Sequence, residues 1–150
     1  GAGMEVVFSD MHNDNIDVSL EFFDGQSLSF TCKNVGLEGV LAQSDFISLH
    51  VPGGDLIGAA EIAKMKDGVF LLNAARGGVI NEEALLDALE SGKVAGAGLD
   101  VFKNEPTPAV KVLMNGKVSL TPHIGAATGE AQDRIGTELA AHIDSLAASL

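Results

Sequence analysis

Several residue types and segments that are typical of particular classes of protein are rare or absent in this sequence. Its 150 residues include one cysteine, Cys32, and neither tryptophan nor tyrosine. A single cysteine excludes an internal disulfide and is typical of proteins of a reducing compartment. No apolar run has the length of a membrane span, and no charged-then-apolar leader opens the chain. These absences predict a cytoplasmic protein.

Positive charge is scarce as well. Nine lysines and arginines stand against 21 acidic residues, which gives a net charge of −12 and a pI of about 4.5. Such a surface repels phosphate backbones and anionic lipids, so nucleic acid and membranes are poor candidate partners. The hydrophobic fraction of 46% and the mean hydropathy of +0.24 predict a globular chain, long enough for one domain with a single core.

Short apolar runs alternate with helical patterns along most of the chain. The runs are nearly continuous, as in strands of a parallel sheet that is covered on both faces. Strands are expected at 5–9, 46–51, 69–74, 94–102 and 117–122. Helices are expected at 56–68, 81–93 and 128–149, the second with Asn81 as its N-cap. This order predicts an α/β fold with a doubly wound parallel sheet.

The segment 16–32 has a different period. Its apolar residues occupy every second position on both sides of the turn signal Asp24-Gly25, a pattern that predicts a β-hairpin. If Phe22 pairs with Leu28, the apolar side chains share one face, and this pairing requires a loop with an odd number of residues. The same register pairs Leu20 with Phe30 and Val18 with Cys32.

Side chains suited to acid–base chemistry follow three successive predicted strands. Arg76 follows the strand at 69–74. Asp100 lies in the strand at 94–102 and Glu105 follows it, and His123 follows the strand at 117–122. Ligands of parallel α/β sheets bind beyond the carboxyl ends of the strands. An imidazole beside a carboxylate can transfer a proton, and an arginine binds a substrate carboxylate. For Arg76 taken alone, an ion pair with a surface acid is the favoured interpretation.

The sequence around these residues resembles a known family. The stretches KMKDGVFLLNAARGGVIN (64–81), AGAGLDVFKNEP (95–106) and LTPHIGAAT (120–128) are similar to segments of the D-isomer-specific 2-hydroxyacid dehydrogenases. The resemblance covers the nucleotide-binding domain of that family from about Val35 onward. It implies an NAD-dependent oxidoreductase that acts on a 2-hydroxy or 2-oxo acid.

The resemblance also implies roles for individual residues. His123 would be the acid/base, Glu105 its orienting partner and Arg76 the substrate anchor. Asp10 would accept hydrogen bonds from the adenosine ribose and so favour NAD over NADP. The residues expected to line the cofactor are Asp10, His50, Val51, Pro52, Ala74, Ala75, Arg76, Asp100, His123, Gly125 and Ala126.

One expected motif is missing. No G-x-G-x-x-G precedes the predicted strand at 5–9, although such a loop holds the pyrophosphate of a dinucleotide. We therefore expect residues 1–150 to form a partial NAD-binding, Rossmann-like domain without a substrate domain, inactive alone and binding NAD weakly or not at all. Without its first strand, the sheet is expected to close up into a flavodoxin-like order or to borrow a strand from a second copy.

Alternative interpretations remain open. The chain could be a catalytically inactive unit of folding or assembly, or a family member that uses its nucleotide site for regulated association with another protein. A stable homodimer whose interface includes the predicted last helix (128–149) would favour either of these two interpretations. The acidic stretch DMHNDNID (10–17) fits no standard metal site, so the sequence predicts no metal and a solvated turn there.

Overall fold

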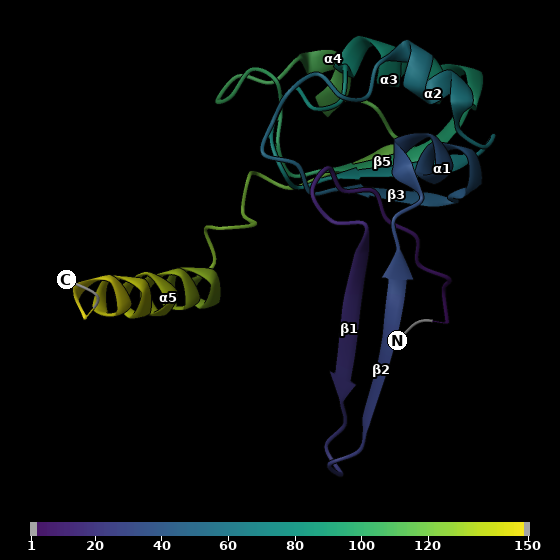
Figure 1. Cartoon of the computed structure of the whole chain (residues 1–150). Helices are drawn as coiled ribbons and strands as arrows, with labels where there is room; N and C mark the ends of the chain where they lie inside the picture. Colours follow the sequence, from purple (N-terminus) through teal and green to yellow (C-terminus); the bar gives the residue numbers. More distant parts are fainter. Residues whose placement is uncertain (1–2, 149–150) are drawn as a thin grey trace.

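A computed structural model describes residues 3–148 of the chain (Figure 1). Its strands are β1 (Asn15–Glu21), β2 (Ser27–Lys33), β3 (Phe46–Leu49), β4 (Val69–Asn73), β5 (Val94–Leu99) and β6 (Val118–Leu120). Its helices are α1 (Gly36–Gln43), α2 (Ala59–Lys64), α3 (Glu82–Ser91), α4 (Val110–Leu113) and α5 (Gly129–Ala147). The sequence did not predict α1 and α4, which are short and lie outside the clear helical patterns.

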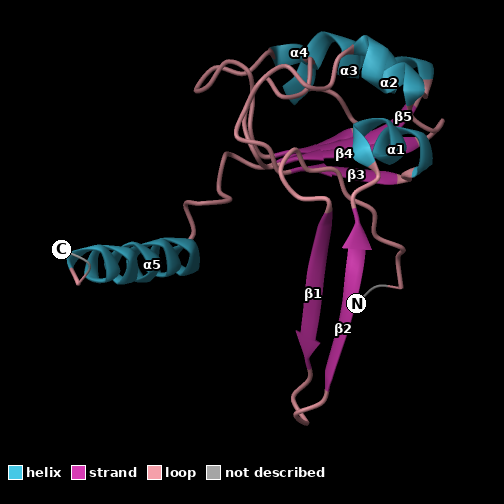
Figure 2. Ribbon diagram, viewed as in Figure 1, coloured by secondary structure: helices cyan, strands magenta, loops and turns pink. Residues whose placement is uncertain are grey.

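The main sheet is parallel and follows the chain order β3-β4-β5-β6. Helices α1 to α4 lie on one side of this sheet, whereas the hairpin and α5 lie on the other (Figures 1 and 2). The predicted α/β class with a parallel sheet is therefore confirmed. The expected cover on both faces is not formed by the described residues, because no helix packs on the second face.

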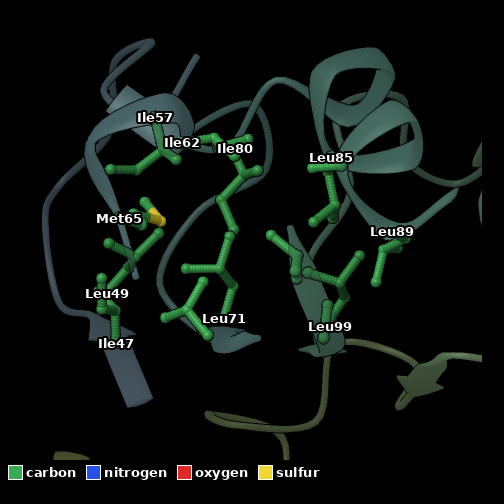
Figure 3. Close-up of a cluster of buried hydrophobic side chains, with 14 of the residues drawn as sticks. Ile47, Leu49, Ile57, Ile62, Met65, Leu71, Ile80, Leu85, Leu89 and Leu99 are labelled. Atoms are coloured by element: carbon green, nitrogen blue, oxygen red, sulfur yellow. The ribbon is translucent and has the colours of Figure 1, made fainter. Parts of the chain in front are cut away.

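The core lies between the sheet and the helices. Val69, Leu71 and Asn73 of β4 point into it and are buried, whereas Phe70 and Leu72 point to the open face and are each 41% exposed. Leu71, Leu85, Leu89 and other aliphatic side chains fill the space between the layers (Figure 3). Burial of these apolar side chains is the main stabilising contribution to the fold.

The helix boundaries follow from capping residues. Asn81 Oδ1 accepts a hydrogen bond from Ala84 N at 3.1 Å, and Gly92 ends α3 with a φ of +81°, as the sequence predicted. Thr128 caps α5 in the same way, because its Oγ1 accepts a hydrogen bond from Ala131 N at 3.2 Å. None of the helices within residues 3–148 combines the length and the apolar composition that a bilayer span requires.

The predicted hairpin is present, with its register shifted by two residues. Leu20 pairs with Leu28, Val18 with Phe30 and Ile16 with Cys32, around a loop over 22–26. This loop has an odd number of residues, as expected, so the apolar side chains still share one face. The shift arises because the Phe22 and Gln26 backbones close the turn by a hydrogen bond from Phe22 N to Gln26 O at 2.8 Å.

The strand predicted at 5–9 does not join the main sheet. Phe8 forms only an isolated parallel bridge with Asn34, in which Val35 N donates to Phe8 O at 3.0 Å. This contact holds the segment at the base of the hairpin. Because β3 is the edge of the sheet, residues 3–148 do not form the closed flavodoxin-like order, which corrects that expectation. Borrowing of a strand from a second copy stays a prediction.

Candidate active site

The carboxyl ends of β4, β5 and β6 bring the predicted catalytic residues to one edge of the sheet. Asp100 directly follows β5, and Arg76 and His123 each come three residues after the end of their strand. Glu105 lies on the loop that leaves β5. Parallel strands place such positions side by side, so the arrangement follows directly from the strand order.

His123 and Glu105 form the central pair of the site. Glu105 Oε2 accepts a hydrogen bond from His123 Nδ1 at 2.7 Å, and Glu105 Oε1 accepts one from Phe102 N at 2.8 Å. The hydrogen bond from His123, with a smaller contribution from Phe102, lowers the pKa of Glu105 below its ordinary value. A carboxylate is only an acceptor, so the proton lies on Nδ1 and leaves Nε2 for exchange with a substrate.

Asp100 holds the segment that carries His123. Its carboxylate is buried, and it accepts hydrogen bonds from Thr121 Oγ1 at 2.6 Å, Ile124 N at 2.9 Å and Gly125 N at 2.9 Å. Burial tends to raise the pKa of Asp100, but these hydrogen bonds outweigh it, so the pKa lies below its ordinary value. The carboxylate therefore stays charged and fixes the loop.

The backbone at His123 is strained. Its φ is +56°, in the left-handed region that residues other than glycine rarely adopt. Such a conformation persists only where its surroundings hold it. Here the Asp100 carboxylate holds the chain on both sides of His123. Ile124 N and Gly125 N, which follow His123, donate to it, and so does the hydroxyl of Thr121, which precedes His123.

The turn that carries Arg76 is fixed by Asn73. This buried amide donates to Arg76 O at 2.9 Å and accepts from Ala75 N at 3.1 Å. Gly77 then passes so close to the β5 loop that a Cβ there would lie 1.8 Å from Phe102 O. The turn therefore packs against the segment that leads to Glu105, and the Arg76 side chain is exposed beside it.

Other predicted site residues lie apart from this group. Asp10 lies in the loop before the hairpin, where its Oδ1 accepts from His12 N at 2.7 Å and from Asn13 N at 2.9 Å. The hydrogen bond from His12 is the main cause that lowers the pKa of Asp10. His50, just beyond β3, shares a hydrogen bond of 2.9 Å with Ser48 Oγ. Within residues 3–148, no hydrogen bond or ion pair joins Asp10 or His50 to Arg76, Asp100, Glu105 or His123.

The remaining predicted cofactor residues follow the strand ends. Ala74 and Ala75 precede Arg76, Gly125 and Ala126 follow His123, and these small side chains leave the edge of the sheet accessible. Val51 and Pro52 continue the chain after His50. A planar ring can approach an edge of this kind, so the residues present fit the nicotinamide half of a dinucleotide.

Sequence reasoning missed two residues that shape the site, Asn73 and Thr121. Each is a polar residue at the carboxyl end of an apolar strand, where a buried polar side chain needs a partner. That position is a usable signal for Asn73, because it is the last residue of β4. Among the described residues, no group of three or more His, Cys, Asp or Glu side chains could hold a metal ion.

The fold and the site define a nucleotide-binding domain with a histidine–carboxylate pair and an arginine at its strand ends. Residues 1–125 match the family described as D-isomer specific 2-hydroxyacid dehydrogenase, NAD binding domain. The chain belongs to this family, whose members are NAD-dependent oxidoreductases that act on 2-hydroxy or 2-oxo acids.

Similar proteins include enzymes with several substrates. Over 144 residues, 45% are identical to hydroxypyruvate reductase of Thermotoga maritima, covering 91% of this chain and 43% of that protein. Over 110 residues, 47% are identical to D-3-phosphoglycerate dehydrogenase of Mycobacterium tuberculosis, covering 71% of this chain and 21% of that protein. The chain thus spans less than half the length of these relatives.

Solved structures give the same result. A glyoxylate reductase from Paecilomyes thermophila is similar with a TM-score of 0.66 and 46% identity, covering 76% of this chain and 34% of that one. A D-lactate dehydrogenase from Aquifex aeolicus, complexed with NAD and lactic acid, is similar with a TM-score of 0.64 and 34% identity, covering 79% and 41%. A family member from Xanthobacter autotrophicus, at 38% identity and a TM-score of 0.56, covering 59% and 30%, is in complex with NADPH, so the comparisons support NAD or NADP.

Proposed function

We propose that this chain forms the nicotinamide side of the active site of a D-2-hydroxyacid dehydrogenase. The observation that supports the proposal most directly is the hydrogen bond of 2.7 Å between His123 and Glu105, next to the turn that carries Arg76. A bound NAD would supply the hydride acceptor or donor for C2 of the substrate. All other parts of the chemistry fall to side chains of the protein.

The three side chains have separate tasks. Nε2 of His123 removes the proton of the substrate hydroxyl in the direction of oxidation and returns it in reduction. Glu105 holds the ring in the tautomer with Nδ1 protonated and stabilises the cation that forms. Arg76 binds the substrate carboxylate with its guanidinium, whose two-pronged geometry matches that of a carboxylate.

Asp10 is proposed to select the cofactor. A carboxylate at the end of the segment 5–9 accepts from both ribose hydroxyls and repels a 2′-phosphate, which favours NAD over NADP. In the structure this carboxylate already binds the backbone of its own loop, so the ribose would have to use its second oxygen or replace those hydrogen bonds.

The substrate is proposed to be a small 2-hydroxy acid, with specificity like that of phosphoglycerate dehydrogenase. The identity of 47% over 110 residues to D-3-phosphoglycerate dehydrogenase of Mycobacterium tuberculosis supports this choice. The assignment of residues 1–150 to part of an NAD-binding domain and a cytoplasmic location are proposed on the sequence alone. Self-association as a homodimer is proposed as well.

A second function, in which the chain is an inactive unit of folding or assembly, is favoured by a different observation. Exposed apolar side chains are unusually frequent on the hairpin, on the open face of the sheet and on α5. In this case the site residues would take no part in a reaction; absence of turnover and weak or absent binding of NAD are proposed for the 150 residues alone under either function.

A titration with NADH, followed by nicotinamide fluorescence, separates the two functions. If the proposed site binds, fluorescence saturates, and Asp10→Ala weakens binding at least about 10-fold, the size of one lost charged hydrogen bond. Asp14→Ala is the matched control, because this neighbouring carboxylate accepts no hydrogen bond through its side chain. Absence of binding at millimolar NADH would mean that Arg76, Glu105 and His123 have no cofactor to act with in these 150 residues, and would favour the function as an assembly unit.

A further inference from the structure

A carboxylate in the first turn of α3 binds a loop of the candidate active site. Glu82 Oε1 accepts a hydrogen bond from Lys103 N at 2.8 Å, although the two residues are 21 positions apart in the chain. Lys103 lies in the loop that leaves β5 and leads to Glu105. The contact uses the backbone of Lys103, and within residues 3–148 no ion pair joins the two side chains. The carboxylate therefore acts on the path of the loop.

The helix α3 does not need Glu82 for its own N-terminus. Asn81 is the N-cap, and Glu83 supplies a second carboxylate in the first turn, where negative charge favours the helix dipole. The glutamate in the first turn of α2 is used differently, because Glu61 Oε2 binds the backbone at the start of its own helix. In the described part of the chain, Lys103 N is the one hydrogen-bond donor to the Glu82 carboxylate. Glu82 thus binds outside its helix.

The peptide unit that Glu82 binds is adjacent to the group that orients Glu105. Phe102 O and Lys103 N belong to one planar peptide unit. Its oxygen lies so close to Gly77 that a Cβ there would be at 1.8 Å, and its N–H donates to Glu82. The N–H just before it, Phe102 N, donates to Glu105 Oε1 at 2.8 Å. Both polar groups of this peptide unit are therefore held, and a rotation of the unit would move Glu105 away from Phe102 N.

Glu82 is attached to a rigid element. Leu85 and Leu89 of α3 are buried in the core together with Leu99 of β5 (Figure 3). A group on a packed helix holds its partner more precisely than a group on a loop. The helix also begins shortly after the turn that carries Arg76, so Glu82 connects the Glu105 loop to the element that follows the proposed substrate anchor.

We propose that Glu82 is a positioning residue of this active site, which holds the Glu105 carboxylate toward His123 by binding the backbone of the Glu105 loop. The proposal rests on the proposed dehydrogenase function and deepens it, because it adds a residue of α3 to the three side chains at the strand ends. Within residues 3–148, Glu82 makes no hydrogen bond or ion pair with His123 or Glu105. It therefore acts through the loop and takes no part in proton transfer.

The pKa of Glu105 distinguishes positioning from a simple effect of charge. Hydrogen bonds from His123 and, second, from Phe102 N lower this pKa, whereas the nearby charge of Asp100 acts in the opposite direction. A negative charge on Glu82 would also raise the pKa of Glu105, so an effect of charge alone predicts a lower pKa when Glu82 is removed. Loss of positioning weakens the two hydrogen bonds and predicts a higher pKa. The two explanations thus differ in sign.

A pH titration of the Glu105 carboxyl carbon by NMR, together with amide hydrogen exchange, tests the proposal on the 150-residue chain. In Glu82→Ala the titration of Glu105 should move up toward the ordinary pKa of 4.5. The Phe102 amide should exchange about 5-fold faster, the size of one lost hydrogen bond. Glu82→Gln keeps an acceptor oxygen for Lys103 N and should restore both values. Glu83→Ala is the matched control, because the Glu83 carboxylate accepts no hydrogen bond within residues 3–148.

An unchanged titration of Glu105 in Glu82→Ala, or one that moves to lower pH, would overturn the proposal. If the alanine variant does not fold, Glu82→Asp decides, because it keeps the charge at the helix start but its side chain is one methylene group shorter. It should raise the pKa of Glu105 as well, and an unchanged value would again overturn the proposal.

None of these measurements uses NAD or a substrate. Absence of NADH binding together with the expected change at Glu105 would therefore count against the proposed function and not against the role of Glu82 in the loop. Binding of NADH together with an unchanged titration of Glu105 would reject the role of Glu82 and leave the proposed function intact.

Discussion

Three hydrogen-bond donors converge on the Asp100 carboxylate, and two of them are backbone groups directly after His123. His123, the proposed acid/base, is therefore positioned by a residue whose carboxylate binds the backbone that follows it. The left-handed backbone of His123 is compatible with this arrangement only as long as the loop is held. Individual side chains thus divide the work between chemistry and positioning.

Replacement of Asp100 should loosen this loop. We expect Asp100→Ala to lower the free energy of unfolding by about 2–4 kcal/mol, because Ile124 N and Gly125 N lose their acceptor in a buried position. Chemical denaturation measures the change. Asp100→Asn, with a single acceptor oxygen, should fall between the wild type and the alanine variant. An alanine variant as stable as the wild type would contradict the account.

The stabilising contribution of the His123–Glu105 pair should be lost at acidic pH. The pKa of Glu105 is lowered in the folded state, so the contribution of the pair is complete above the ordinary glutamate pKa of 4.5 and is lost as the pH falls through the lowered value. The Nδ1 proton resonance of His123 should therefore shift below that range. In Glu105→Gln this low-pH step should be absent, and a step that persists there would have another origin.

The sequence identified Arg76, Glu105 and His123 because the carboxyl ends of parallel strands converge, a rule that needs only the order of the strands. It missed Asn73. The role of this residue depends on a turn that brings Ala75 N and Arg76 O within hydrogen-bond distance of the Asn73 side chain. Asp10 illustrates the opposite limit. The family resemblance implied that Asp10 binds the ribose, but the hydrogen bonds of its Oδ1 depend on a loop that the sequence pattern does not describe.

The strands and helices show which patterns carry over from sequence to structure. The extents of β4, α3 and α5 agree closely with the predicted ranges, since apolar period and capping residues are local signals. The segment 5–9 failed to become a strand because pairing depends on a neighbour, and its neighbour here is Asn34 alone. The two-residue shift in the hairpin likewise depends on the closure of the turn.

The contact between the β4 turn and the β5 loop offers a sharp test. A Cβ at Gly77 would lie 1.8 Å from Phe102 O, so Gly77→Ala must move one of the two segments. We expect a loss of about 2–4 kcal/mol in unfolding free energy and a displaced Arg76. Gly116→Ala is the control, because no atom lies within 4 Å of its Cβ position. Equal stability of both variants would show that the turn is free to move.

The molecule as a whole combines a well-packed half with surfaces that lack a neighbour. The layer between the sheet and α1 to α4 is well packed. Apolar side chains are exposed on the open face of the sheet (Phe46, Phe70 and Leu72), on the apolar face of the hairpin, and on α5 (Ile135, Leu139 and Ile143). The amino-acid composition does not predict this imbalance, because it counts apolar residues and contains no information on where they lie in the fold. The active-site edge lies at the boundary between the two halves, where β6 leads into α5.

The most direct test of the account is an amide chemical-shift map of the chain during a titration with NAD. We expect the perturbed residues to cluster at the strand ends, over 74–78, 100–105 and 121–126, and around Asp10, whereas β1 and β2 remain unchanged. This would place the cofactor beside His123 and Arg76. Perturbations that instead follow the open face of the sheet, around Phe46, Phe70 and Leu72, would contradict the central claim that these strand ends form a nicotinamide site.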